Sequence, residues 1–229
     1  MKKIVSIVGL TSSGKTGVGI ELAKRFNGEI ISCDSRQVYK YLDLATGKDK
    51  TYPHHLIDIL EPGDSFSVFE YQKLAFEKIE DVLGRGKLPI LVGGTGLYSR
   101  SVVENYFGGE KYHVLQIALM PPKELIRERI SIRLDERIKQ GMVEETQALL
   151  DKNIPDEWFS KLGLEMYWNV ELIRGRISLE EYRDQLFIKI CQYAKRQRTW
   201  FKKEKNTIFL EELEKFLDTC MFLVSKFVS

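Results

Sequence analysis

The sequence contains only three cysteines and three histidines among its 229 residues. Cys33, Cys191 and Cys220 have neither a CxxC spacing nor the pattern of a zinc site, which argues against a disulfide framework and a structural zinc centre. An odd number of scattered thiols is typical of a reducing compartment, so we expect a cytoplasmic protein. His54 and His55 are adjacent but have no further ligand three or four residues away, which favours a structural turn over a metal site.

Long apolar runs are also missing. No stretch approaches the roughly 18 apolar residues that a membrane-spanning helix needs, so we expect no membrane association. The apolar run at residues 4–8 is too short for a signal peptide. Charge is nearly balanced, with 35 basic and 33 acidic residues, so overall charge identifies no nucleic-acid partner. Evidence for a nucleic-acid partner therefore has to come from local basic patches in the sequence.

Short apolar runs alternate with helical patterns over the first 120 residues. Strands are expected at residues 2–8, 28–34, 55–60, 88–94 and 113–120, and helices at 14–26 and 67–86. This alternation predicts a parallel sheet with right-handed crossovers. Because the apolar runs are continuous, the strands are expected to be buried on both faces.

From residue 121 onward the pattern is helical. Helices are expected at residues 121–141 and 178–204, followed by a strand at 206–210 and a C-terminal helix. Ser178 is the expected N-cap of the long helix, with Glu181 completing a capping box. The fold class is therefore α/β, a P-loop NTPase-like parallel sheet flanked by helices, with a helical C-terminal part. We assign residues 1–120 to the core, 121–203 to a helical substrate-binding part packed on it, and 204–229 to the elements that complete the core.

A phosphate-binding loop follows the first strand. Gly9, Gly14, Lys15 and Thr16 satisfy the pattern G-x-x-x-x-G-K-[ST], with a strand before it and a helix after it. The glycines let backbone N–H groups converge on phosphate oxygens, and the helix N-terminus adds positive potential. Lys15 supplies a point charge to the distal phosphate, and the Thr16 hydroxyl a ligand for Mg²⁺. Most such loops bind ATP or GTP, so a nucleotide-dependent kinase is the default interpretation.

Two further strand ends carry polar residues. Asp34 ends the second strand, where a carboxylate binds Mg²⁺ indirectly, accepts a proton, or merely caps the following helix. Gln37 has the amide needed for a two-point hydrogen bond to an adenine edge, although a solvated loop side chain is the simpler alternative. The glycine-rich turn at residues 93–96 permits close approach to a ligand, and Thr95 would direct its hydroxyl toward the phosphate site.

Basic side chains gather on two helices. Arg129, Arg133 and Arg137 share one helical face at intervals of four residues. The residues from Lys195 to Arg198 form another concentration of positive charge on the long helix. Such faces are usually solvated, but they also suit a clamp on a leaving pyrophosphate or contact with an RNA backbone.

The segments GLTSSGKT, SCDSRQVYKYLDLATGK, PHHLIDILEPGDSFSVFEYQ, PILVGGTGLY, RLDERIKQGMVEE and AKRQRTWFKK occur in this order. Together they resemble the tRNA dimethylallyltransferases, the isopentenyl transferase family, from about residue 3 to about residue 203. The resemblance implies transfer of a dimethylallyl group from dimethylallyl diphosphate to the exocyclic amine of the adenine 3′ of the anticodon. Pyrophosphate is released, Mg²⁺ is the expected cofactor, and the expected partner of the monomer is the anticodon stem-loop of tRNA.

The resemblance also assigns roles to individual residues. Asp34 would take the proton of the amine, and Thr95 and Arg196 would hold the pyrophosphate. The diphosphate-binding set would be Gly9, Thr11, Ser12, Ser13, Gly14, Lys15, Thr16 and Arg133, with Thr16 also binding the metal. The acceptor-binding set would be Ser35, Gln37, Lys195 and Gln197.

Two features depart from the family pattern. Only residues 99–112 separate the glycine-rich turn from the next strand, where the family usually carries a helical insertion that grips the anticodon stem. Gly163 is followed by Leu164 and Glu165 in place of a Gly-Tyr-Lys-Glu-like motif. Two alternatives stay open, a dimethylallyltransferase acting on free AMP, ADP or ATP, and a small-molecule kinase.

Overall fold

The structure is a computed structural model that describes residues 2–109 and 111–229. One sheet of six strands has the order β3-β2-β4-β1-β5-β6, and every pairing is parallel. The strands are β1 Lys3–Gly9, β2 Gly28–Ser32, β3 His54–His55, β4 Leu88–Gly93, β5 His113–Leu119 and β6 Thr207–Leu210. The parallel sheet confirms the fold class predicted from the sequence.

Ten α-helices and one short 3₁₀ turn are assigned within the described residues. The helices are α1 Lys15–Arg25, α2 Asp43–Thr46, α3 Val68–Gly84, α4 Gly96–Val103, α5 Lys123–Lys139, α6 Met142–Leu150, α7 Asp156–Leu162, α8 Glu165–Ile173, α9 Leu179–Phe201 and α10 Phe216–Val228. As expected, Ser178 and Glu181 form a capping box at the start of α9. Among these described helices, none has both the length and the apolar composition to cross a lipid bilayer.

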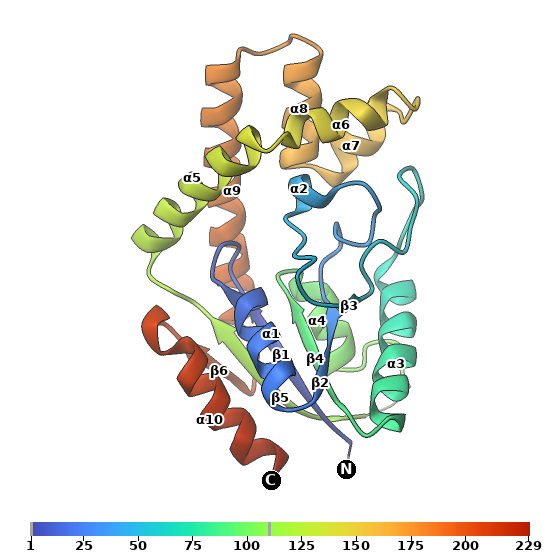
Figure 1. Cartoon of the computed structure of the whole chain (residues 1–229), viewed down its shortest axis with the longest axis vertical. Helices are drawn as coiled ribbons and strands as arrows, with labels where there is room; N and C mark the ends of the chain where they lie inside the picture. The colour runs from blue at the N-terminus through green and yellow to red at the C-terminus, as the bar shows by residue number, and fades with distance from the viewer. Residues whose placement is uncertain (1, 110) are drawn as a thin grey trace.

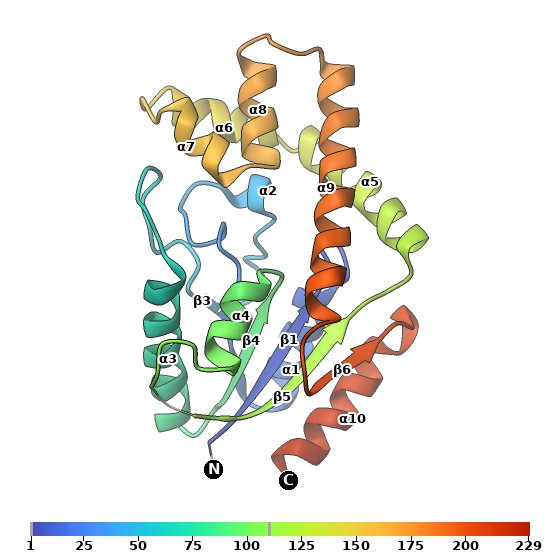
Figure 2. The ribbon, with the colours of Figure 1, turned by 180° about the vertical axis from the view of Figure 1, so that it is seen from behind.

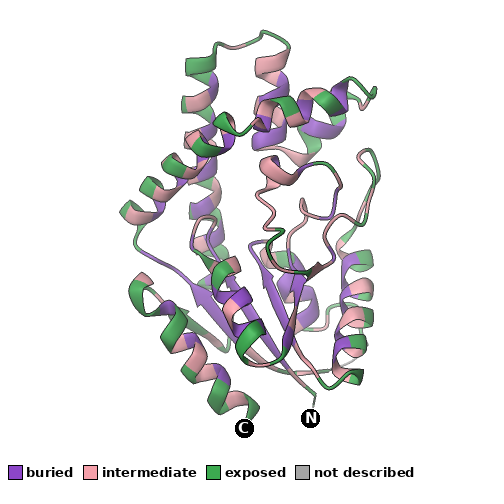
Figure 3. Ribbon diagram, in the orientation of Figure 1, coloured by how far each residue is buried: buried purple, intermediate pink, exposed green. Residues whose placement is uncertain are grey.

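Helices cover both faces of the sheet. One face packs against α1 and α10, and the other against α3 and α4 (Figures 1 and 2). Side chains alternate along β1, so that Val5 and Ile7 join the first apolar layer and Ile4 joins the second. All three are fully buried, which explains why the apolar run of this strand is continuous (Figure 3).

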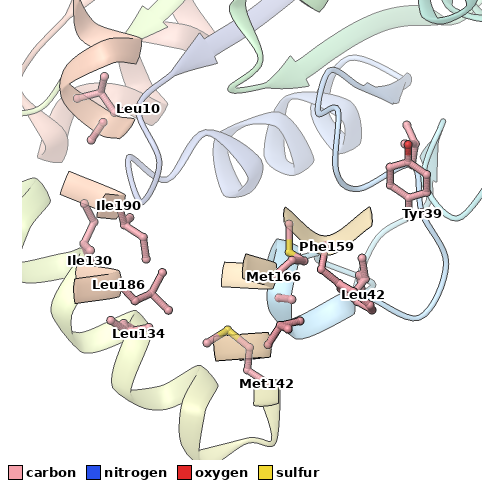
Figure 4. Packing of buried hydrophobic residues seen from close by; sticks show 14 of the residues in the cluster. Leu10, Tyr39, Leu42, Ile130, Leu134, Met142, Phe159, Met166, Leu186 and Ile190 are labelled. Atoms are coloured by element: carbon pink, nitrogen blue, oxygen red, sulfur yellow. The ribbon is translucent and has the colours of Figure 1, made fainter. Parts of the chain in front are cut away.

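A third apolar cluster lies beyond the carboxyl ends of the strands. It joins α5–α9 to residues of the core, including Leu10 of the phosphate loop and Leu42 (Figure 4). Met142, Phe159 and Met166, all fully buried, form its interior. The helical part is therefore held against the phosphate loop by a continuous hydrophobic contact, since Leu10 belongs to the same cluster.

The prediction of a strand at residues 55–60 is wrong. Only His54 and His55 pair with β2, and the chain then turns through Leu56 and Asp58, whose φ angles are +61° and +54°. Left-handed residues cannot continue an extended strand. Asp58 instead forms an ion pair with Lys48, whose side chain is fully buried. The apolar pattern of this segment thus reflects packing in a loop.

The start of α2 depends on one distant carboxylate. Glu145 of α6 accepts hydrogen bonds from the backbone N–H groups of Asp43, Leu44 and Ala45. These are N–H groups that a helix cannot satisfy internally. The contact fixes the loop that carries Gly47 toward the phosphate site.

We predict that Glu145→Ala lowers the free energy of unfolding by about 1–3 kcal/mol, because partly buried backbone donors lose their acceptor. The measurement is urea denaturation at equilibrium. The matched control is Glu144→Ala on the same helix, an exposed position where a change within about 0.5 kcal/mol is expected. Equal effects of both substitutions would show that the carboxylate does not support α2.

Candidate active site

Three functional loops meet because of the strand order. β4 lies between β1 and β2, and all three strands are parallel. Their carboxyl ends therefore lie at one edge of the sheet, which is where ligands bind in open α/β folds. The phosphate loop follows β1, the glycine-rich turn follows β4, and Asp34 follows β2. The structure thus brings together three segments that the sequence assigns to one site.

The phosphate loop has no room for side chains at its first glycine. Gly9 has a φ of +147°, and a Cβ there would lie 2.4 Å from the carbonyl oxygen of Leu119. Within the loop, the ammonium group of Lys15 donates to the carbonyl of Leu10 at 3.1 Å. Ser13 is fully buried, and within the described part of the chain its hydroxyl has no hydrogen-bond partner. An unsatisfied buried hydroxyl at this place suits a ligand that supplies the missing partner.

Two arginines of α5 form the wall opposite the loop. Arg129 and Arg133 line a cavity of about 480 Å³ together with Lys15 and Thr16. Arg133 donates to the carbonyl of Gly47 at 3.2 Å. The Nη1 atom of Arg129 is buried and makes no hydrogen bond to any described residue. The cavity is therefore lined by cationic donors, one of which has a free N–H.

These charges are held where water is scarce. Burial lowers the pKa of Lys15 from 10.5 to about 8, with Asp34 opposing and Arg133 reinforcing the shift. Burial also lowers the pKa of Arg133, and the nearby Arg137 acts in the same direction. Keeping either side chain charged thus costs free energy in the protein without ligand. A polyanion such as a diphosphate would remove that cost, because it supplies opposite charge at the same place.

A smaller cavity of about 80 Å³ opens on the inner side and shares Lys15 and Arg133 with the larger one. Asp34 lines it, and one carboxylate oxygen accepts from the N–H of Arg36 at 2.9 Å. Thr95 accepts from the N–H of Ser35 at 3.1 Å, and their hydroxyls lie 3.3 Å apart. Lys15 and Arg133 therefore adjoin both the larger cavity and the inner cavity that Asp34 lines.

Gln37 and Gln197 both line the inner cavity, but their amides are already engaged. Gln197 accepts from the N–H of Thr11 at 2.8 Å and donates to the carbonyl of Gly94 at 2.9 Å. Gln37 accepts from Ser32 at 3.2 Å and donates to the carbonyl of Thr46 at 3.3 Å. Gln197 thus ties the phosphate loop to the glycine-rich turn, and direct contact of either amide with an acceptor stays a prediction.

The two basic residues predicted on α9 differ in position. Arg196 is exposed at the rim, with its guanidinium 5.8 Å from the ring of Tyr193, which lines the inner cavity. Lys195 lies on another side of the helix and lines a separate cavity with Leu10 and Arg198. The structure therefore does not bring Lys195 to the acceptor site that the sequence predicts, because successive helical residues point about 100° apart.

Arg36 and Glu165, for which the sequence predicted no functional role, connect the site to the helical part. Arg36 donates to the carbonyl of Leu162 at 3.0 Å, and its guanidinium lies 5.4 Å from the ring of Tyr193. Glu165 is buried and accepts from Arg137 at 3.1 Å, while Arg36 lies 3.9 Å away from it. The spacing of Arg137 on the basic face was the only signal for this network.

The structural elements described above are shared with known proteins. A model of the IPP transferase family matches residues 37–110 and 107–204. The tRNA dimethylallyltransferase 2 of Shewanella sediminis is 37% identical over 267 residues, covering 87% of this chain and 89% of the relative. That of Treponema denticola is 38% identical over 277 residues, covering 89% of this chain and 93% of the relative.

A solved structure is similar over almost the whole chain. The full-length tRNA isopentenylpyrophosphate transferase of Bacillus halodurans has a TM-score of 0.92 and 29% identity, with 99% of this chain and 96% of that chain covered. The stretch aligned with the Shewanella relative, 267 residues, is longer than this chain of 229 residues. The relative therefore has residues that this chain lacks. The two segments matched by the family model meet at residues 107–110, within the region where the sequence predicts a missing insertion.

We predict that Lys15→Met stabilises the free protein at pH 7. A pKa of about 8 in place of 10.5 corresponds to at most about 3 kcal/mol. Because the side chain keeps some access to solvent, we expect a gain of about 1–2 kcal/mol, measured by urea denaturation. The gain should shrink as the pH rises through about 8, since wild-type Lys15 then loses its proton in the folded state.

The same substitution separates stability from binding. The affinity of the wild type for inorganic pyrophosphate should exceed that of Lys15→Met below about pH 8, and the difference should narrow above it. Isothermal titration calorimetry at several pH values measures the affinity of each protein for pyrophosphate. A variant that is less stable than the wild type, yet binds pyrophosphate equally well, would contradict this account of Lys15.

Proposed function

The chain belongs to the IPP transferase family, and from this premise we propose that it uses its phosphate edge to modify an adenine base. Its curated relatives are tRNA dimethylallyltransferases by name. We propose that it transfers the dimethylallyl group of dimethylallyl diphosphate to the exocyclic amine of the adenine 3′ of the anticodon. The observation that carries this proposal is that Asp34 lines a cavity which shares Lys15 and Arg133 with the larger cavity beside Arg129.

The diphosphate belongs on the cationic side. Its oxygens would accept from the backbone N–H groups of the loop, from Lys15 and from the free N–H of Arg129. As the bond between the allylic carbon and the diphosphate oxygen breaks, negative charge grows on the leaving group. Cations held beforehand in a poorly hydrated site stabilise that charge without reorganisation. Arg196 at the rim remains a proposed pyrophosphate contact.

Mg²⁺ fits the donor set of this edge. The Thr16 hydroxyl lines both cavities, and hard oxygen donors of this kind bind Mg²⁺ together with substrate phosphates. The described residues contain no cluster of three or more His, Cys, Asp or Glu side chains, which is consistent with a metal held largely by the substrate. When bound, Mg²⁺ supplies additional neutralisation of the leaving group.

The adenine belongs on the carboxylate side. A base in an anticodon loop can be turned out of its stack and into a cavity that a paired base could not reach. The amine nitrogen forms a bond to the allylic carbon as pyrophosphate departs, and Asp34 accepts the proton that the nitrogen releases. The local hydrogen bond from Arg36 holds the carboxylate in place for this step.

Transfer to free AMP, ADP or ATP remains the second candidate, because the chain is shorter than its tRNA-specific relatives. A kinase would use the same phosphate loop, but the family membership favours the prenyl diphosphate. We further propose that the enzyme acts as a monomer in the cytoplasm. Its three unpaired thiols are consistent with a reducing compartment.

Asp34→Asn should leave binding of both substrates nearly unchanged and lower the chemical step by roughly two to four orders of magnitude. The reason is that an amide cannot accept the proton from the attacking amine. Single-turnover rates with saturating dimethylallyl diphosphate and anticodon stem-loop measure the effect. Asp218→Asn, an exposed change on α10, is the matched control. A wild-type rate in Asp34→Asn would leave Asp34 only its role in the local turn.

Arg129→Ala should raise the KM for dimethylallyl diphosphate by roughly ten- to a hundredfold, the usual value of a hydrogen bond to a charged group. It should also lower kcat, because charge on the leaving group is less well stabilised. Arg127→Ala, two residues away on the same helix and beside Phe187, serves as the control and should change neither value appreciably. If both substitutions have the same effect, α5 contributes only general positive charge.

A further inference from the structure

An exposed chain of aromatic contacts runs across α4, α9 and α3. The guanidinium of Arg100 lies 5.9 Å from the ring of Trp200 and 5.5 Å from that of Tyr106. Tyr106 is in turn 6.4 Å from Phe107, and Phe107 is 5.4 Å from Phe69. We call this set, Trp200, Arg100, Tyr106, Phe107 and Phe69, the aromatic strip.

The aromatic rings of the strip face solvent although the backbone beneath them is fixed. Phe69 is 55% exposed, Phe107 is 49% exposed and Tyr106 is 40% exposed. The side chain of Gln72, which is only 2% exposed, accepts from the N–H of Phe107 at 3.2 Å and donates to Asn105 at 3.2 Å. The loop is therefore built to hold its aromatic side chains outward, at a free-energy cost that a bound partner would offset.

One end of the strip reaches the active site. Trp200 packs against the backbone of Gly96, where an added Cβ would lie 2.2 Å from the indole nitrogen. Gly96 directly follows Thr95, whose hydroxyl contacts Ser35 beside Asp34. The contacts thus lead from the glycine-rich turn over α4 to Phe69 at the start of α3. Figure 2 shows α4 lying between α9 and α3.

Phe107 of the strip lies where the match to the family model is divided. The two matched segments of that model meet at residues 107–110. The chain passes there from α4 to β5, and the stretch aligned with the Shewanella relative is longer than this whole chain. The strip is consequently the surface that this chain presents at the junction.

The charges around the strip identify the part of a nucleic acid that it suits. Glu104 lies 2.9 Å from the guanidinium of Arg100, and Glu204 lies 3.9 Å from it. These carboxylates neutralise the cation and disfavour a phosphate at the same place. Flat, uncharged π faces remain, and these stack on unpaired bases with little regard to sequence.

We propose that the aromatic strip stacks the unpaired anticodon-loop nucleotides next to the adenine that enters the active site. This inference rests on the proposed function, since a loop adenine that reaches Asp34 carries its neighbours to the rim formed by the glycine-rich turn. Base stacking on the strip then supplies contact area that does not depend on gripping the stem. The occupant is single-stranded RNA, recognised through its bases.

The test is the binding of an anticodon stem-loop that carries 2-aminopurine beside the target adenine, without dimethylallyl diphosphate. Each of Tyr106→Ala and Phe107→Ala should weaken binding at least about fivefold, the lower end of what one stacked base contributes. The 2-aminopurine should stay quenched in the wild-type complex, because stacking on an aromatic ring replaces stacking on a neighbouring base, and it should brighten in the Tyr106→Ala complex. Phe107→Trp should retain wild-type affinity, and Phe222→Ala, which removes a 57% exposed aromatic ring from α10, should have no effect.

The salt dependence distinguishes stacking from phosphate contact. The slope of affinity against salt should be the same in Phe107→Ala as in the wild type, because no phosphate contact is lost. Unchanged affinity in both alanine variants, or a shallower slope, would overturn the proposal. The proposal would also be overturned if the wild type were a dimer and Phe107→Ala a monomer, since the strip would then be an interface between two copies.

The binding assay is independent of turnover. If the wild type binds the stem-loop through the strip but transfers no dimethylallyl group to it, the proposed reaction fails while this inference stands. If transfer proceeds and the alanine variants bind and react as the wild type does, the inference fails while the proposed reaction stands.

Discussion

The side-by-side pairing of β1, β4 and β2 is the constraint on which the site depends. In a parallel sheet the carboxyl ends of neighbouring strands share one edge, so each loop that follows a strand opens onto the same space. Here that edge brings a phosphate loop, a glycine-rich turn and Asp34 together. Gln197 of α9 then ties the first two loops to each other, which fixes the helical part above them.

The site is prepared for a polyanion at the expense of the free protein. Burial lowers the pKa of both Lys15 and Arg133, and Arg129 keeps a buried N–H without a partner among the described residues. Such groups are costly until a ligand satisfies them. In the proposed reaction, the same cost would let the cations act on a leaving diphosphate without reorganising first, so local instability and catalysis would have a common origin.

Local patterns made part of this predictable from the sequence. The phosphate loop and the capping box of Ser178 depend on neighbouring residues, and the structure has both. Asp34 was identifiable because the strand expected from the sequence ends on it. The role of Glu165 was not, since its partner Arg137 lies on a distant helix. The strand at 55–60 was wrong because Asp58 pairs with Lys48, a tertiary contact that periodicity does not reveal.

The central claim is that two adjoining cavities at one edge of the sheet hold a prenyl diphosphate beside Lys15 and Arg133 and an RNA adenine beside Asp34. The most direct measurement is incubation of the wild type with dimethylallyl diphosphate labelled in its prenyl carbons, an anticodon stem-loop and Mg²⁺. The account predicts one label on the exocyclic amine of the adenine 3′ of the anticodon for each pyrophosphate released. Labelling of free AMP in preference to the stem-loop, or phosphate transfer from ATP with no labelled RNA, would contradict it.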